Sequence, residues 1–184
     1  MDSVFEDLYN KYHQDVFQFL IYMVRNRSQA EDLAQEVYIR VLKSYQHFEG
    51  KSSEKTWLFS IAKNVAIDHF RKQKNWKNRI AEKFDWNRQD LKTEEALPEE
   101  IALANEEVWL LYDCLKKCST DYRLVIITRY LQQLSIVETA EVLGWSESKV
   151  KTTQHRAIKL LRKEMSRRLR GEDEDGEKVR VERS

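Results

Sequence analysis

Residues 135–156 read SIVETAEVLGWSESKVKTTQHR, a stretch with the signals of two short helices joined by a sharp turn. Ser135 and Glu138 fit a capping box, in which the two side chains satisfy backbone N–H groups at a helix N-terminus. Gly144 stands where the turn between the helices needs a positive φ. Val150, six residues further on, can anchor the second helix in the core. This spacing predicts a helix-turn-helix.

In a helix-turn-helix the second helix enters the major groove of DNA, and its first outward residues contact the bases. Val150, Ala157 and Leu161 define the inward face of this helix. The side chains expected to face outward toward bases are Ser148, Lys149, Thr152, Thr153 and Arg156. The side chains expected at phosphates, which give affinity without sequence information, are Lys151, Lys159, Arg162 and Lys163. His155 contacts a phosphate or has a plain surface role. The alternative is a basic face that only keeps the helix soluble.

The composition of the whole chain agrees with helices. Only 4 glycines and 1 proline occur in 184 residues, too few for the tight hairpins of a β-sandwich or barrel. Charged residues make up 34% and hydrophobic residues 41%, which suits helices with one buried stripe and one solvated face. We predict an all-α protein.

Apolar periodicity divides the chain into two small helical domains. Residues 1–75 are predicted to form three or four helices, and residues 105–170 form a second unit that contains the helix-turn-helix. Residues 76–104 lose the periodicity and gain acids, so we expect a flexible linker with short helical pieces. Residues 171–184 carry 9 charges in 14 residues, and we expect a disordered tail.

One predicted helix of the first domain begins at a capping box of Ser28 and Glu31. Its buried side is expected to hold Leu33, Val37, Val41 and Leu42. Its exposed side is expected to present Asp32, Gln35, Glu36 and Lys43.

The charge is distributed unevenly although the net charge is only +1. Residues 71–79 carry 5 bases and no acid, and residues 151–170 carry 8 bases and 1 acid. Residues 82–107, between them, carry 9 acids and 3 bases. Two basic patches flanking an acidic stretch indicate two contacts with one polyanion. Solvated helix faces with chance clustering are the alternative.

The first basic patch continues from a helix that begins near Glu54. Asn64, Asp68 and Arg71 follow at steps of four and three residues and therefore share a face, with Lys63 and Lys72 beside them. Basic side chains interleaved with aromatic ones suit single-stranded nucleic acid, because bases stack while phosphates pair with cations. Trp57, in the first turn of this helix, is either a stacking platform or part of the core.

Several classes of protein are excluded. No apolar run approaches the roughly 18 residues that span a bilayer, and the N-terminus lacks the basic start of a signal peptide. Two cysteines are too few for a disulfide framework, so we expect a soluble protein of the cytoplasm. Cys114 and Cys118 are four residues apart, a spacing that could serve a metal site or a thiol switch. Packing in the core is the preferred interpretation. We find no catalytic site and expect no metal and no cofactor.

Three motifs in this order resemble a known family. They are AEDLAQEV at 30–37, TWLFSIAKN at 56–64, and the helix-turn-helix that ends in His155, Arg156 and Ala157. Together they resemble bacterial sigma-70-family factors, and the short two-domain layout is similar to the extracytoplasmic-function (ECF) group. Gln154 stands where an apolar residue is common in the family, so we expect it to be half exposed.

The resemblance implies an initiation subunit of RNA polymerase. It implies that Asp32, Gln35 and Glu36 bind the clamp helices of the largest polymerase subunit, and that the second domain meets the flap of the second-largest subunit. The residues implied at the −10 element are Trp57, Lys63, Asn64, Asp68, Arg71 and Lys72. Those implied at the −35 element are Ser148, Lys149, Lys151, Thr152, Thr153, His155, Arg156 and Lys159. A membrane-bound anti-sigma factor is a further implied partner, while the chain itself does not insert into a membrane.

Two other functions remain as alternatives. A free-standing helix-turn-helix repressor or activator would bind duplex DNA alone, but would leave the faces around Asp32 and Trp57 without a role. An enzyme acting on nucleic acid needs clusters of carboxylates or metal ligands, which the sequence lacks.

Overall fold

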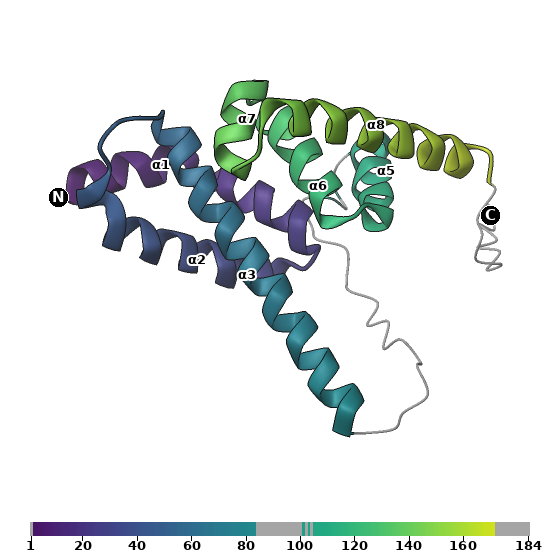
Figure 1. Ribbon diagram of the computed structural model, residues 1–184, viewed down its shortest axis with the longest axis horizontal. Helices are drawn as coiled ribbons and strands as arrows, with labels where there is room; N and C mark the ends of the chain where they lie inside the picture. The colour runs from purple at the N-terminus through teal and green to yellow at the C-terminus, as the bar shows by residue number, and fades with distance from the viewer. Residues whose placement is uncertain (1, 84–100, 102, 104, 172–184) are drawn as a thin grey trace.

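The computed structural model describes residues 2–83, 101, 103 and 105–171, and the regular elements within these ranges are helices (Figure 1). The all-α prediction is confirmed. None of the described helices combines the length and the apolar character that crossing a bilayer requires. The predicted linker beyond residue 83 falls mostly outside the described residues, and so does the predicted disordered tail beyond Gly171.

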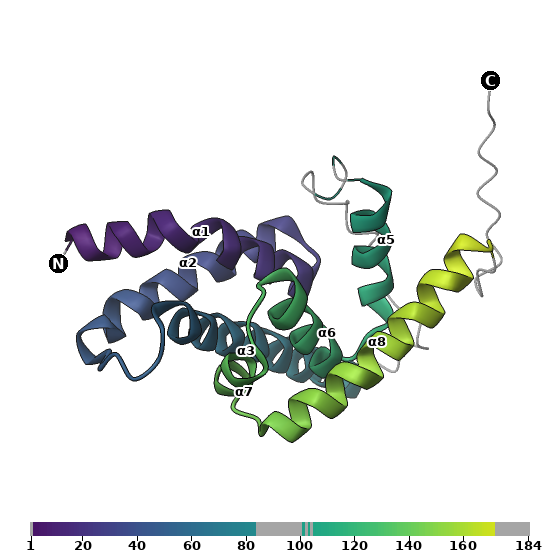
Figure 2. The same ribbon diagram turned by 90° about the horizontal axis from the view of Figure 1, so that it is seen from above.

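The first half of the chain is built from α1 (Asp2–Val24), α2 (Arg27–Ser44) and α3 (Glu54–Lys83), which pack against one another (Figures 1 and 2). A 3-10 turn, Tyr45–His47, follows α2. The side chains that fill the space between the three helices are fully buried and include Phe19, Leu20, Val37, Val41, Leu58 and Phe59. Phe19 and Phe59 meet edge to face with ring centroids 5.6 Å apart.

The junction between α1 and α2 differs from the prediction. Asn26, and not Ser28, caps α2: its side chain accepts a 2.9 Å hydrogen bond from the N–H of Gln29. Arg25 precedes it at a φ of 61° and donates its N–H to the carbonyl of Ile21. Asn26 starts the helix two residues earlier than the predicted capping box, and Glu31 is instead paired with Arg27 at 2.9 Å.

One further expectation for this half is corrected. Leu42 was expected in the core but is 56% exposed. Val37 and Val41 form the buried face of α2, and Leu42 lies beside that face. Helix α3 continues to Lys83 and so runs into residues 76–104, where the sequence predicted a linker with short helical pieces. The basic residues at 71–79 are good helix formers, so loss of apolar periodicity does not end the helix. In Figure 1 the C-terminal part of α3 extends away from the other helices.

The second half contains α5 (Glu106–Cys114), a 3-10 turn (Leu115–Lys117), α6 (Thr120–Ile126), a π-helical turn (Ile127–Leu131), α7 (Ile136–Leu143) and α8 (Glu147–Leu169). Helices α7 and α8 are the predicted helix-turn-helix. The expected capping box is present: Ser135 Oγ accepts from the N–H of Glu138, and the Glu138 carboxylate accepts from the N–H of Ser135. Gly144 ends α7 at a φ of 67°. The capping box and the glycine turn predicted from residues 135–156 are therefore confirmed.

The two halves are in direct contact. Helix α7 packs on α3, and α6 with the π-helical turn packs on α1 (Figure 2). Gln132, at the end of the π-helical turn, is 1% exposed and donates to the carbonyl of Asp15 and to the Gln18 side chain, each at 3.2 Å. The second half therefore lies along α1 and α3, and the contact combines these hydrogen bonds with apolar packing, in which the rings of Tyr22 and Tyr112 meet edge to face with centroids 5.6 Å apart.

The turn between α7 and α8 provides a test of the local argument. A Cβ atom added at Gly144 would meet no other atom within 4 Å, so Gly144→Ala changes only backbone strain. An L-residue in this left-handed conformation costs about 1 kcal/mol, so we expect a loss of unfolding free energy of that size. Gly144→Asn should lose less, because asparagine tolerates positive φ. Urea unfolding followed by circular dichroism measures both, and equal stability of the Ala variant would contradict the assignment.

Candidate nucleic-acid interface

Helix α8 presents the predicted base-reading residues to solvent. Ser146 caps the helix by accepting from the N–H of Lys149 at 3.2 Å, and Val150, Ala157 and Leu161 are buried as predicted. The exposed members of the predicted set are Ser148, Lys149, Lys151, Thr152, His155, Arg156 and Lys159, while Thr153 is half buried. One side of α8 is therefore anchored in the core, and the other is an open, strongly basic surface.

Lys149 is held by two neighbours that sequence reasoning did not identify. Its ammonium group lies 3.9 Å from the centre of the Trp145 ring and 3.8 Å from the Asp121 carboxylate. Asp121 is in the first turn of α6, which borders the same shallow groove as Ser148, Thr152 and Arg156. An acid in this position opposes an approaching polyanion and competes with it for Lys149. Only the fold brings residues 121 and 149 together.

Gln154 is half buried, as expected, and the structure gives the reason. Its side-chain oxygen accepts a 2.8 Å hydrogen bond from Nε of Arg129, which lies in the π-helical turn. Arg129 also donates to the carbonyl of Leu134, just before α7. Gln154 therefore joins α8 to the π-helical turn by a polar contact.

Helix α3 carries the second predicted nucleic-acid surface. At roughly 100° per residue, Trp57, Asn64 and Arg71 fall in one sector of the helix. Asn64 and Arg71 are exposed, as is Lys72. Trp57 is half buried and lies against Phe48, with ring centroids 4.8 Å apart. Trp57 therefore packs against Phe48 and is also partly exposed to solvent.

Lys63 does not share this sector. It is half buried, and burial lowers the pKa of its ammonium group. Its neighbour in the same sector of α3 is Phe70, which contacts Arg123 of the second half of the protein. Lys63 therefore differs in burial from Asn64 and Arg71, beside which the sequence placed it.

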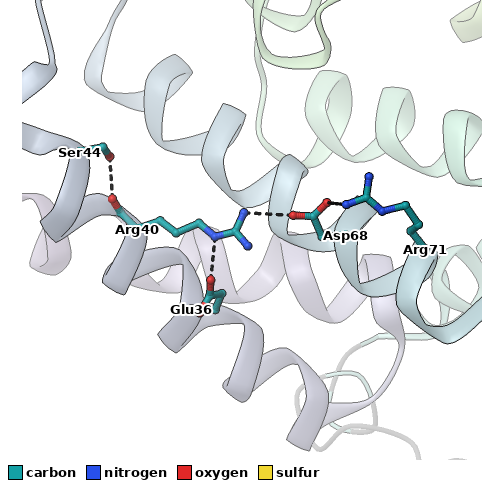
Figure 3. A network of polar contacts seen from close by, with 5 residues as sticks. All are labelled: Glu36, Arg40, Ser44, Asp68 and Arg71. Carbon is teal, nitrogen blue, oxygen red and sulfur yellow. Dashed lines mark hydrogen bonds and ion pairs between the residues drawn. The ribbon is translucent and has the colours of Figure 1, made fainter. Parts of the chain in front are cut away.

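A polar network joins the two predicted surfaces of the first half (Figure 3). Arg40 of α2 donates to Glu36 at 2.7 Å and to Asp68 of α3 at 3.3 Å, and Asp68 also pairs with Arg71 at 2.8 Å. The hydrogen bond to Glu36, with a smaller contribution from Asp68, raises the pKa of the Arg40 guanidinium. Arg40 was not singled out from the sequence, because its partner Asp68 lies on a different helix. It links the acidic face of α2 to the open face of α3.

The acidic face of α2 is accessible. Asp32 and Gln35 are exposed and Glu36 is half buried. Beside them runs an apolar groove between α1 and α2, to which Gln35, Ile39 and Leu42 contribute, and Ile39 is itself 44% exposed. Exposed aliphatic side chains next to carboxylates are typical of a surface that binds another protein.

The two cysteines are unsuited to ligand chemistry. Cys114 and Cys118 are free and buried. Burial raises the pKa of the Cys118 thiol to about 11 and also raises that of Cys114, which disfavours the thiolate form that binds metals. Among the described residues, no group of three or more His, Cys, Asp or Glu side chains is arranged to hold a metal ion.

Known proteins match both halves of this arrangement. Residues 8–75 match the family described as Sigma-70 region 2, and residues 109–161 match Sigma-70, region 4. The chain is 56% identical to the ECF RNA polymerase sigma factor SigX of Bacillus subtilis, over 100% of this chain and 93% of that protein. It is 35% identical to the RNA polymerase sigma factor YlaC of the same organism, over 90% and 94% of the two chains.

Solved structures agree on the fold. The sigma factor RpoE of Bartonella quintana, solved with the anti-sigma factor NepR, superimposes with a TM-score of 0.68 at 20% identity, over 88% of this chain and 96% of that one. CnrH, solved with the cytosolic domain of CnrY, gives 0.64 at 19% identity, over 94% and 92%. The chain therefore belongs to the sigma-70 family of RNA polymerase factors. Its group within that family is the ECF group, to which the SigX relative belongs.

The contact between Asp121 and Lys149 can be tested directly. We expect Asp121→Asn to tighten binding of a −35 duplex by up to about fivefold, the scale of one surface ion pair. The salt dependence should steepen, because a freed lysine adds a phosphate contact. Fluorescence anisotropy with a labelled duplex measures both quantities.

The matched comparison is the same change in a Lys149→Ala background, where Asp121→Asn should have a smaller effect. An equal gain in both backgrounds would show that Asp121 acts only by repelling DNA and not through Lys149.

Proposed function

We propose that this protein is an ECF-type initiation subunit, which binds core RNA polymerase, directs it to specific promoters and helps to open the −10 region. The observation that carries the proposal is that one chain has two exposed basic faces of different kinds, one on α8 and one on α3. A capped recognition helix suits duplex DNA, and an aromatic, basic face on α3 suits a single strand. Both halves match regions of a single family in the family's order.

The −35 element is read by α8. In this role Ser148, Thr152 and Arg156 reach base edges, and Lys151 and Lys159 pair with phosphates. Their exposure on one side of a helix anchored by Val150 and Ala157 supports the assignment.

The −10 element is opened along α3. Asn64, with Arg71 and Lys72 beside it, receives bases that leave the stack, and Trp57 flanks them. Breaking a base-pair step costs about 1–2 kcal/mol of stacking, which contacts to the displaced bases offset. Such a subunit binds and deforms DNA, and the formation of phosphodiester bonds belongs to the polymerase. The protein is therefore not itself an enzyme and needs no cofactor of its own.

Core polymerase is the first protein partner. Asp32, Gln35 and Glu36 meet the clamp helices of the largest subunit, next to the apolar groove of α1 and α2. The second half meets the flap of the second-largest subunit. Arg40 contacts both Glu36 and Asp68. It thereby fixes the position of the polymerase-binding face of α2 relative to the −10 face of α3.

An anti-sigma factor is the second protein partner. The sigma factor RpoE, which has the same fold, was solved with the anti-sigma factor NepR, and this supports such a partner here. We propose that it is membrane-bound and that it holds the chain in the cytoplasm away from the polymerase.

Transcription by purified bacterial core polymerase, with and without the protein, tests the proposal. We expect new RNA 5′ ends whose upstream DNA shares a −35 and a −10 element. The double variant Asp32→Ala, Gln35→Ala should lower affinity for core polymerase about tenfold, because it removes two exposed contacts at the centre of the predicted interface. Titration of core polymerase with a fluorescent protein measures this loss.

The control is Asp7→Ala with Asn10→Ala, two exposed positions of α1 away from that face. It should bind and transcribe like the unaltered protein. Absence of new 5′ ends, together with tight duplex binding by the protein alone, would favour a free-standing repressor or activator. If the double variant bound core polymerase with normal affinity, the assignment of Asp32 and Gln35 to the clamp contact would be wrong.

A further inference from the structure

Lys149, in the first turn of α8, has its ammonium group held from two sides. The group lies 3.9 Å from the centre of the Trp145 ring and 3.8 Å from a carboxylate oxygen of Asp121. Trp145 belongs to the turn between α7 and α8, and Asp121 belongs to α6, which packs against α8. Separate segments of the second half therefore fix where this side chain ends.

The ring and the carboxylate restrain Lys149 in different ways. A ring face attracts a cation and thereby fixes its position. A carboxylate at ion-pair distance offsets the charge, so the pair adds little to the sequence-independent attraction between basic side chains and phosphates. An ammonium group has three N–H donors, and one carboxylate leaves donors for a further acceptor. Lys149 is therefore better suited to donating to a base edge than to neutralising a phosphate.

Lys149 also lies where a recognition helix reads DNA. The first outward residues of such a helix contact base edges. Lys149 and Arg156 are seven residues apart, so they share a face of α8, and both are exposed and border the groove between α6 and α8. Seven residues of helix span about 10 Å, and successive base pairs are about 3.4 Å apart. The two side chains therefore reach positions about three base pairs apart.

The chemistry of an ammonium group selects among the bases. Guanine presents two acceptors, O6 and N7, in the major groove, and a lysine or arginine that donates to them is the commonest specific contact. Adenine and thymine each present one acceptor there, and cytosine presents a donor. A lysine on a freely moving stem would pair with the nearest phosphate of any sequence, because its ammonium group is a compact point charge. When the group is held in one place, guanine is its best partner.

We propose that Lys149 is a specificity-determining residue, which selects guanine at one position of the −35 element, and that Asp121 and Trp145 are the residues that position it. Asp121 lowers the affinity of Lys149 for phosphates of any sequence more than its affinity for the preferred base. Asp121 thereby contributes to promoter selection although its charge has the same sign as that of DNA. This inference rests on the proposed function, because it takes α8 to read the −35 element.

A purely structural role for Asp121 predicts something different. The residue lies in the first turn of α6, where the helix dipole stabilises a carboxylate. If this were its whole role, replacing it would change the stability of the second half and leave the base preference unaltered. The base preference is therefore the quantity to measure.

The test uses a promoter identified by its new RNA 5′ end, with its −35 base pairs randomised and its −10 element unchanged. Core polymerase with the full-length protein transcribes the pool, and a transcribed barcode identifies the template of each RNA. We expect a roughly tenfold preference for guanine at one position. Lys149→Ala should lose this preference and keep the preference about three base pairs away, where Arg156 donates.

Asp121→Asn keeps the shape of the side chain and removes its charge. The preference for guanine should fall roughly threefold, the scale of one surface ion pair, while transcription from poor −35 sequences rises. Trp145→Leu should also weaken the preference, because it removes the ring, and Trp145→Phe should retain most of it. Circular dichroism checks that each variant keeps its helices.

Glu147→Gln is the matched control. Glu147, in the first turn of α8, has a carboxylate oxygen 3.7 Å from the ammonium group of Lys151, and both side chains are exposed. Removing this acid frees a lysine that meets phosphates, so transcription should rise by a similar factor for all −35 sequences. The preference for guanine should stay unchanged.

Three results would overturn the inference and leave the proposed function standing, because transcripts form in each case. The guanine preference could persist in Lys149→Ala, or the position that depends on Lys149 could prefer another base. Asp121→Asn could raise transcription equally for all −35 sequences, as Glu147→Gln does, and Asp121 would then not position Lys149. Failure of the protein to start transcripts from any template would contradict the proposed function itself, and the −35 role of Lys149 with it.

Discussion

The structure depends on one helix, α3, whose three sides have three different environments. Leu58, Ala62 and Val65 bury one side in the core with α1 and α2. Lys55 and Phe70 give a second side to the other half of the protein. Asn64 and Arg71 leave the third side open to solvent. A helix of 30 residues, about 45 Å long, is long enough to hold these contacts without crowding.

The balance of forces differs between the cores and the contact that joins them. Within each half, helices meet through fully buried apolar side chains, and this apolar packing continues across the contact between the halves, where Tyr22 meets Tyr112. Between the halves, Gln132, Arg25 and Arg123 bind carbonyl oxygens. Such bonds exchange readily with water and contribute little net free energy each, while they fix one relative orientation.

Features coded locally could be predicted from the sequence, and features that need two distant segments could not. The capping box of Ser135 and Glu138 and the positive φ of Gly144 depend on neighbouring residues, so the pattern of residues 135–156 predicted them. The cap of α2 was misassigned because Asn26 and Ser28 compete within three positions. The pairing of Arg40 with Asp68 and of Lys149 with Asp121 joins different helices, and no spacing in the sequence reveals it.

Crosslinking from the two DNA faces tests the central claim most directly. A photoreactive residue at His155 on α8 and another at Lys72 on α3 would each be activated in a complex of the protein, core polymerase and promoter DNA. The account predicts two separate crosslinks, His155 in the upstream element and Lys72 in the downstream element, roughly 25 base pairs apart. Crosslinks from both residues within a single stretch of a few base pairs would contradict it.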